Sequence, residues 1–75
     1  MPKLPVVSGI KVVKAMSKID YEVDHQTGSH IILRNNNSPY RRLTIPNHRN
    51  LAKGTLRKII KQAGLSVEEF IKLIS

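Results

Sequence analysis

The sequence predicts an α+β fold in which helices cover one face of a three-stranded antiparallel sheet. Two observations carry this prediction: apolar residues recur at helical spacing near both ends of the chain, and the middle holds three short β-branched segments separated by turn residues. With 75 residues, 40% of them hydrophobic, the chain has apolar side chains for one core and one domain, residues 1–75. Any site on so small a domain is expected to be shallow and open, which suits a polymer better than a small metabolite.

The first helix is expected over residues 9–18, after Ser8, whose hydroxyl is suited to cap a helix N-terminus. Its buried stripe is expected to consist of apolar residues at helical spacing: Ile10, Val13, Met16 and Ile19, with Val12 and Ala15 beside them. Lysines at positions i, i+3 and i+7 are expected on the opposite, exposed face: Lys11, Lys14 and Lys18.

Three strands are expected to follow, over residues 21–26, 30–34 and 41–45. Residues 27–29, which include Gly28, form the tight turn between the first two strands, and residues 35–39 form a loop before the third. Pro46 ends the third strand because proline has no backbone N–H to donate to a sheet.

Two more helices are expected after a polar loop, residues 47–53. The longer helix begins near Gly54 or Thr55 and ends before Gly64, because glycine commonly follows a helix C-terminus. Its buried face is expected to hold Leu56, Ile59, Ile60 and Ala63. A capping box over residues 66–69 opens the last, short helix. The resulting order, α-β-β-β-α with a short C-terminal helix, is also that of the double-stranded-RNA-binding fold.

The charge distribution predicts a polyanionic partner. Thirteen Lys and Arg against five Asp and Glu give a formal net charge of +8, and no acidic residue occurs from His25 through Val67. That segment carries the cations Arg34, Arg41, Arg42, Arg49, Lys53, Arg57, Lys58 and Lys61. A field of one sign over more than half the chain is typical of a nucleic-acid-binding surface. The alternative is a solvated basic surface that has no partner.

Several classes of protein are excluded or disfavoured by residue supply. The absence of cysteine excludes disulfides, zinc-thiolate sites and thiol nucleophiles, and is consistent with a reducing cytoplasm. No apolar run approaches the roughly 18 residues of a membrane span, and Met1–Val7 is too short and too interrupted by proline for a signal peptide. Membrane binding is disfavoured because no helix pairs basic residues with Trp or Phe at an interface. The four scattered glycines form no nucleotide-binding loop, so no small-molecule cofactor is expected. The composition as a whole predicts a cytoplasmic protein.

The histidines are the candidates for acid–base chemistry, because imidazole is the most frequent general acid or base in enzymes. His30 follows the Gly28–Ser29 turn at the start of a strand, so its ring is rigidly mounted yet reachable from solvent, and the turn amides can point at a phosphate. His48 lies between a strand and a helix, where site residues often gather. His25 is expected to be a packed or edge residue of the first strand.

Lys53, Arg57 and Lys61 step by four along the exposed side of the second helix, and Thr55 lies at its start. The helix N-terminus attracts anions, so this stripe predicts phosphate contacts, with a merely solvated helix face as the alternative. A metal site at Glu22 and Asp24 is the disfavoured alternative chemistry, because so few carboxylates can cluster.

Three motifs together resemble the HicA, or YcfA-like, family of toxin ribonucleases. They are Gly28-Ser29-His30, then Pro46-Asn47-His48, then the run GTLRKIIKQAGLSVEEF over residues 54–70. The resemblance begins near Leu4 or Ser8 and covers essentially the whole chain. It implies a double-stranded-RNA-binding-like fold, metal-independent cleavage of mRNA, and pairing with a HicB-type antitoxin protein that covers the active site.

The resemblance also implies roles for individual residues. The histidine of the glycine turn is catalytic in the family and corresponds to His30, while His48 and Ser29 correspond to auxiliary positions. Many members carry Lys or Arg where Thr27 stands and a second histidine where Ile31 stands, so activity is expected to be lower or to depend more on Arg34 and His48. Expected RNA contacts are Gly28, Arg34, Arg41, Arg42, Arg49, Lys53, Thr55, Arg57 and Lys61.

The expected reaction is cleavage of RNA with His30 as general acid or base, a role that is typically worth about 10²–10⁴-fold in rate. A non-catalytic binding module for structured RNA is the main alternative. A basic adaptor that binds only an acidic protein is a third, and it predicts no salt-sensitive affinity for RNA.

Overall fold

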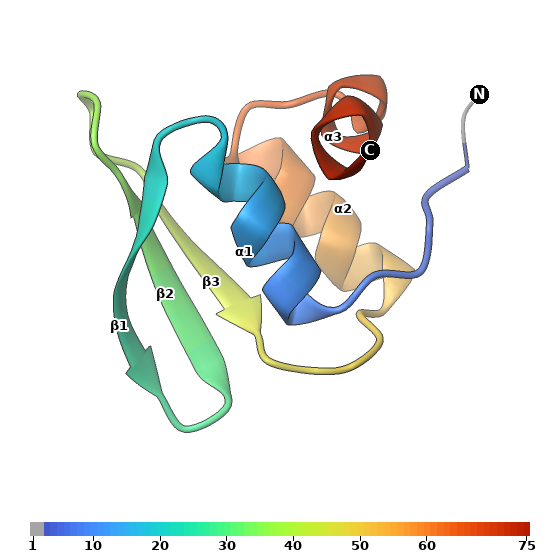
Figure 1. Ribbon diagram of the computed structural model, residues 1–75, viewed down its shortest axis with the longest axis horizontal. Helices are drawn as coiled ribbons and strands as arrows, with labels where there is room; N and C mark the ends of the chain where they lie inside the picture. Colours follow the sequence, from blue (N-terminus) through green and yellow to red (C-terminus); the bar gives the residue numbers. More distant parts are fainter. Residues whose placement is uncertain (1–2) are drawn as a thin grey trace.

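The computed structural model describes residues 3–75, so Met1 and Pro2 of the expected domain lie outside it (Figure 1). In chain order the elements are α1 (Gly9–Ser17), β1 (Tyr21–Thr27), β2 (His30–Asn35), β3 (Arg42–Pro46), α2 (Lys53–Gln62) and α3 (Val67–Ile74). The strands form one antiparallel sheet in the order β1-β2-β3. The expected α+β fold, with the α-β-β-β-α order of the double-stranded-RNA-binding fold and a short C-terminal helix, is confirmed.

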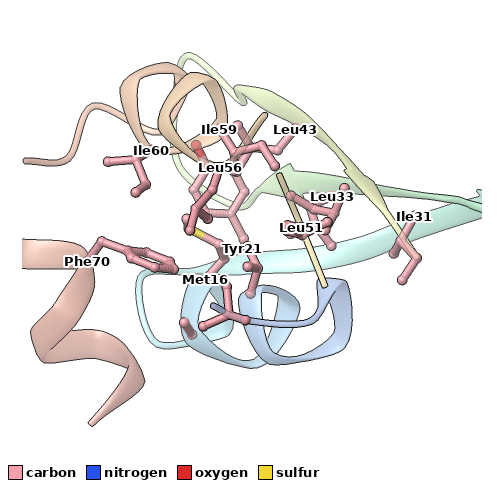
Figure 2. Packing of buried hydrophobic residues seen from close by; sticks show 14 of the residues in the cluster. Met16, Tyr21, Ile31, Leu33, Leu43, Leu51, Leu56, Ile59, Ile60 and Phe70 are labelled. Atoms are coloured by element: carbon pink, nitrogen blue, oxygen red, sulfur yellow. The ribbon is translucent and has the colours of Figure 1, made fainter. Parts of the chain in front are cut away.

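The helices lie together on one side of the sheet, where α1 and α2 pack against strands and α3 contacts both helices (Figure 1). Alternate residues of β2 and β3 point into this helical layer, and their side chains are buried: Ile31, Leu33, Leu43 and Ile45. Phe70 of α3 is 0% exposed and lies beside Met16 and Ile60 in the core (Figure 2). The residues between these buried positions form the open face of the sheet.

Helix α1 begins as predicted but is turned differently about its axis. The Ser8 hydroxyl accepts a hydrogen bond from the Lys11 amide at 3.1 Å, so Ser8 is the N-cap. The buried residues are Gly9, Val12, Ala15 and Met16. Ile10, which was expected in the buried stripe, is 45% exposed. The helix ends at Ser17, one residue earlier than expected.

The orientation of α1 follows from a close backbone contact at Gly9. The Gly9 amide donates a hydrogen bond to the His48 carbonyl at 2.9 Å. A Cβ at this position would lie 2.0 Å from the Pro46 carbonyl oxygen, so only glycine fits without movement. Gly9 faces Pro46 and Asn47 at the end of β3. The next residue, Ile10, is rotated by about 100° around the helix axis and therefore points toward solvent.

The strand boundaries agree with the prediction to within one residue, but β1 does not alternate regularly. Its register with β2 shifts between Val23 and His25, so Asp24 is an extra residue of a bulge. Of β1, Tyr21 alone is buried, and Val23 is 54% exposed. Strand β3 begins at Arg42 and includes Pro46.

The two C-terminal helices are delimited by local signals that the sequence displays. After α2, Gly64 has a φ of +77°, and the Leu65 amide donates to the Ile60 carbonyl at 3.1 Å, which closes the helix end as glycine allows. The expected capping box is confirmed: the Ser66 hydroxyl accepts from the Glu69 amide at 3.1 Å, and the Glu69 carboxylate accepts from the Ser66 amide at 2.9 Å.

Candidate functional site

A groove with a volume of about 400 Å³ separates α2 from the adjoining part of the sheet. It is lined by His30, Arg42, Thr44, Pro46, Thr55, Lys58, Ile59 and Gln62. Polar side chains with hydrogen-bond donors therefore line both walls. This volume is sufficient for a nucleotide-sized group, and the donors suit an anionic one.

The sheet wall of the groove follows from strand alternation. In the β2–β3 pair, His30 lies opposite Pro46, and Arg34 lies opposite Arg42. These residues share the open face because their immediate neighbours in each strand point into the core. Strand β3 is an edge strand next to α2, so its open-face residues Arg42 and Thr44 border the groove.

The helix wall consists of residues that share one face of α2. Thr55, Lys58 and Gln62 are spaced i, i+3 and i+7, which places them in one row along the helix. Ile59 lies at the bottom of this wall and is 2% exposed. Its burial in the core fixes the rotation of α2 and keeps the polar row directed at the groove.

His30 is exposed at the first position of β2, and the backbone around it is held on two sides. It pairs with Thr27 of β1 and with Pro46 of β3. The preceding Gly28 has a φ of +52°, and the Ser29 carbonyl accepts a hydrogen bond from the Asn47 amide at 2.6 Å. The imidazole thus combines a fixed backbone with access to solvent, as a general acid or base requires.

Arg42 on β3 is hydrogen-bonded to a carboxylate on β1, the opposite edge strand of the sheet. Its Nη1 donates to Asp24 Oδ2 at 3.0 Å, and the same oxygen is 2.7 Å from Nδ1 of His25. The hydrogen bond with His25 is the main cause that lowers the pKa of Asp24, and Arg42 adds to it, while burial acts in the opposite direction. His25 is an exposed residue of an edge strand, consistent with its expected place.

Of the expected RNA-contacting residues, Arg42 and Thr55 line the groove together with His30. Arg34 lies beside Arg42 on the open face, and its guanidinium is 5.5 Å from the ring centroid of Tyr40. Arg41 Nη1 donates to the Gln62 carbonyl at 3.4 Å, at the end of α2. Part of the expected set of RNA-contacting cations therefore lies in or near the groove.

The other expected contacts are not among the residues that line the groove. Within the described part of the chain, the exposed side chains of Lys53, Arg57 and Lys61 lie on α2 outside the groove lining. His48 and Arg49 are exposed in the loop between β3 and α2. The structure adds Lys58, Thr44 and Gln62, which the sequence analysis did not select. The spacing of Lys58 and Gln62 from Thr55 was the available signal.

The alternative metal site at Glu22 and Asp24 depends on how the acidic and imidazole side chains are grouped. Among residues 3–75, no group of three or more His, Asp or Glu side chains is placed to hold a metal ion. The Asp24 carboxylate of the alternative Glu22/Asp24 site is hydrogen-bonded to His25 and Arg42. Over the same residues, no helix is long and apolar enough to cross a membrane.

A model of the family described as the HicA toxin of bacterial toxin-antitoxin systems matches residues 9–65. The chain belongs to the HicA toxin family. The match covers more than half of the chain and runs from the start of α1 past the end of α2, so it includes every residue that lines the groove. The resemblance drawn from the three sequence motifs is confirmed. A search among curated proteins found no match to this HicA chain. Membership of a toxin–antitoxin family implies an antitoxin as a partner.

Proposed function

We propose that this HicA toxin is an endoribonuclease that cleaves mRNA, with His30 as its general acid or base. One observation carries the proposal: the exposed imidazole of His30 opens onto a groove whose opposite wall presents the ammonium of Lys58 and the hydroxyl of Thr55. A ribose-phosphate chain needs this combination of a proton-transfer group and a cation. The family match supports the toxin role at the coarser level.

The reaction uses the RNA as its own nucleophile. The 2′-hydroxyl attacks the adjacent phosphorus, the bond to the 5′-oxygen of the next nucleotide breaks, and a 2′,3′-cyclic phosphate and a free 5′-hydroxyl remain. Neutral His30 takes the proton of the 2′-hydroxyl, or protonated His30 supplies the proton to the leaving 5′-oxygen. The groove is open to water, so the second proton exchanges with solvent. No cofactor is required for this balance.

The cationic surroundings of the groove contribute binding and stabilisation of charge. The net charge of +8 and the acid-free segment from His25 through Val67 favour a polyanion, and each phosphate contact releases counterions. During attack the phosphorus centre gains negative charge, so fixed donors near His30 stabilise the transition state more than the bound substrate. Affinity for RNA is therefore expected to fall steeply as salt is raised.

The antitoxin is proposed to be a HicB-type protein that covers this groove. An acidic, preorganised surface complements the cations of the toxin and competes with RNA for them, with fast association by electrostatic steering. A purified antitoxin is expected to block RNA binding and cleavage together. Because the substrate is mRNA, the toxin is proposed to act in the cytoplasm.

Cleavage of a labelled transcript by the purified protein tests the proposal. Wild-type protein is expected to yield fragments with cyclic phosphate ends in the presence of EDTA, and His30→Ala is expected to yield none while keeping its RNA affinity. His25→Gln is the matched control, because it removes an exposed imidazole from the same sheet but outside the groove, and its amide can still donate to Asp24. Equal activity of wild type and His30→Ala would remove His30 from the mechanism. Salt-sensitive binding without fragments would instead favour a non-catalytic module for structured RNA.

A further inference from the structure

The groove lining includes two Lys or Arg side chains, Arg42 and Lys58. They stand on opposite walls, one on the edge strand of the sheet and the other on α2. We infer that Lys58 is the cation that contacts the phosphate beside His30, an assignment that rests on the proposed ribonuclease function.

Arg42 is poorly available for this contact because it is already paired. Its guanidinium donates to Asp24 Oδ2 at 3.0 Å. A phosphate that contacts the remaining N–H groups of Arg42 meets the Asp24 carboxylate beside the same guanidinium, and that negative charge opposes its binding. Arg42 therefore contributes little net attraction while Asp24 holds it.

Lys58 has no such competitor. Across residues 3–75, its ammonium forms no ion pair, and the acid-free segment surrounds it in sequence. Leu56, Ile59 and Ile60 on either side of it are 1–2% exposed, so the core holds α2 in one rotation. The backbone of Lys58 is thus fixed beside the groove, and its four-carbon stem lets the ammonium adjust to a bound phosphate.

The remaining cations of α2 do not replace Lys58. Lys53, Arg57 and Lys61 are exposed on the same helix but outside the groove lining. Their charges interact with a bound phosphate through solvent. Physiological salt weakens such interactions over a Debye length of about 8 Å. They add to the attraction of RNA as a polyanion, whereas a contact inside the groove acts on one phosphate.

The chemistry of the site makes the contribution of Lys58 largest in the transition state. As the 2′-oxygen attacks, the non-bridging phosphoryl oxygens gain negative charge, and an ammonium that already donates to one of them binds it more strongly. The Thr55 hydroxyl and the Gln62 amide stand in the same row of α2 and can donate to the same phosphate. Removing the ammonium is therefore expected to slow cleavage more than it weakens binding.

Lys58→Met and Lys14→Met form a matched pair that tests the assignment. Each removes one positive charge from an exposed helix position and keeps a long side chain with good helix propensity, and Lys14 lies on α1 outside the groove lining. Single-turnover cleavage rates and RNA dissociation constants are measured for both variants and for Lys58→Arg. Lys58→Met is expected to lower the rate about 10- to 100-fold with a change in Kd below about threefold, while Lys14→Met changes both by less than about threefold. Lys58→Arg is expected to recover most of the rate.

A binding measurement separates failure of this assignment from failure of the proposed function. A 2′-O-methyl RNA oligonucleotide cannot supply the nucleophile, so its contact with the groove is observed without cleavage. Binding is expected to shift the His30 ring resonances in wild type and Lys14→Met, and to shift them much less in Lys58→Met. If the two methionine variants behave alike in this assay, Lys58 does not hold the phosphate, whether or not the protein cleaves RNA. If the shift depends on Lys58 but wild type gives no fragments, the phosphate contact stands and the ribonuclease proposal fails.

Discussion

Asp24 and Arg42 are joined across the central strand of the sheet, because Nη1 of Arg42 on β3 donates to Oδ2 of Asp24 on β1 at 3.0 Å. The bulge in β1 supplies the carboxylate, and the side chains reach toward each other over β2. One of the two basic side chains that line the groove is thereby paired with an acid from outside it. We therefore expect Asp24, which does not line the groove, to weaken the binding of an anion to this face.

Asp24→Asn is expected to strengthen RNA binding about 3- to 10-fold at about 50 mM salt, because the substitution removes a negative charge and releases Arg42. Filter binding with a labelled transcript measures the change. Glu22→Gln is the matched control: it makes the same charge change on the same strand, at a residue that forms no ion pair within residues 3–75. Equal gains in the two variants would mean that net charge alone matters and that Arg42 was already free.

Gly9→Ala is expected to destabilise the protein by about 1–3 kcal/mol, because the added methyl group meets the Pro46 carbonyl at 2.0 Å and must push the loop away from α1. Gly54→Ala provides the contrast on α2, since nothing lies within 4 Å of the new Cβ. That variant is expected to gain about 0.5–1 kcal/mol. Urea denaturation of both variants measures the difference, and a neutral Gly9→Ala would contradict the tight contact.

The capping box of α3 is expected to add stability that depends on pH. The hydrogen bond from the Ser66 backbone is the main cause that lowers the pKa of Glu69 below its usual 4.5, followed by the bond with the Ser66 side chain. A carboxyl group whose pKa is lower in the folded protein contributes its stabilisation above its unfolded pKa and loses it as pH falls through the folded value.

Urea midpoints measured from pH 7 to pH 3 test this pH dependence. The advantage of wild type over Glu69→Ala is expected to be constant near neutrality and to shrink below about pH 4.5. Glu69→Gln keeps a hydrogen-bonding side chain without the charge, so its midpoint is expected to lack this pH-dependent component. A wild-type advantage over Glu69→Ala that persists unchanged to pH 3 would show that the carboxylate charge is not involved.

Phe70→Ala is expected to cost about 3–5 kcal/mol, because the ring is 0% exposed and α3 holds α1 and α2 together through it. For a domain of this size that is a large part of the total stability. Circular dichroism melting measures the loss. Phe70→Leu, which leaves a smaller cavity, is expected to lose less than half as much, and equal losses would point away from cavity formation.

The features that the sequence predicted well are those that depend on neighbours in the chain. The Ser8 cap, the turn of α2 into Gly64 and the capping box at Ser66 each involve residues within a few positions, so their hydrogen bonds can be inferred from residue type and spacing. The exposure of His30 could be inferred in the same way, because it follows a tight turn and alternates with the apolar Ile31 in a strand.

The features that sequence analysis did not identify depend on contacts between distant segments. The buried face of α1 is set by the approach of Gly9 to Pro46, so Val12, Ala15 and Met16 of the expected apolar set are buried but Ile10 is exposed. The equal spacing of Lys53, Arg57 and Lys61 indicates that they share one face of α2. The packing of α2 against the sheet determines that a different face, which carries Lys58, borders the groove. The bond between Asp24 and Arg42 arises from a bulge that has no clear local signature.

The backbone of Asn47 and His48 links the hairpin turn before His30 to the start of α1. The Asn47 amide bonds to the Ser29 carbonyl in the hairpin turn, and the His48 carbonyl accepts from the first amide of α1. Both bonds use main-chain atoms. Substitutions of the Asn47 and His48 side chains are therefore expected to leave the hairpin that bears His30 in the same position relative to α1. A change that deletes one of these amide hydrogens, such as proline at position 47 or 9, would remove the corresponding bond.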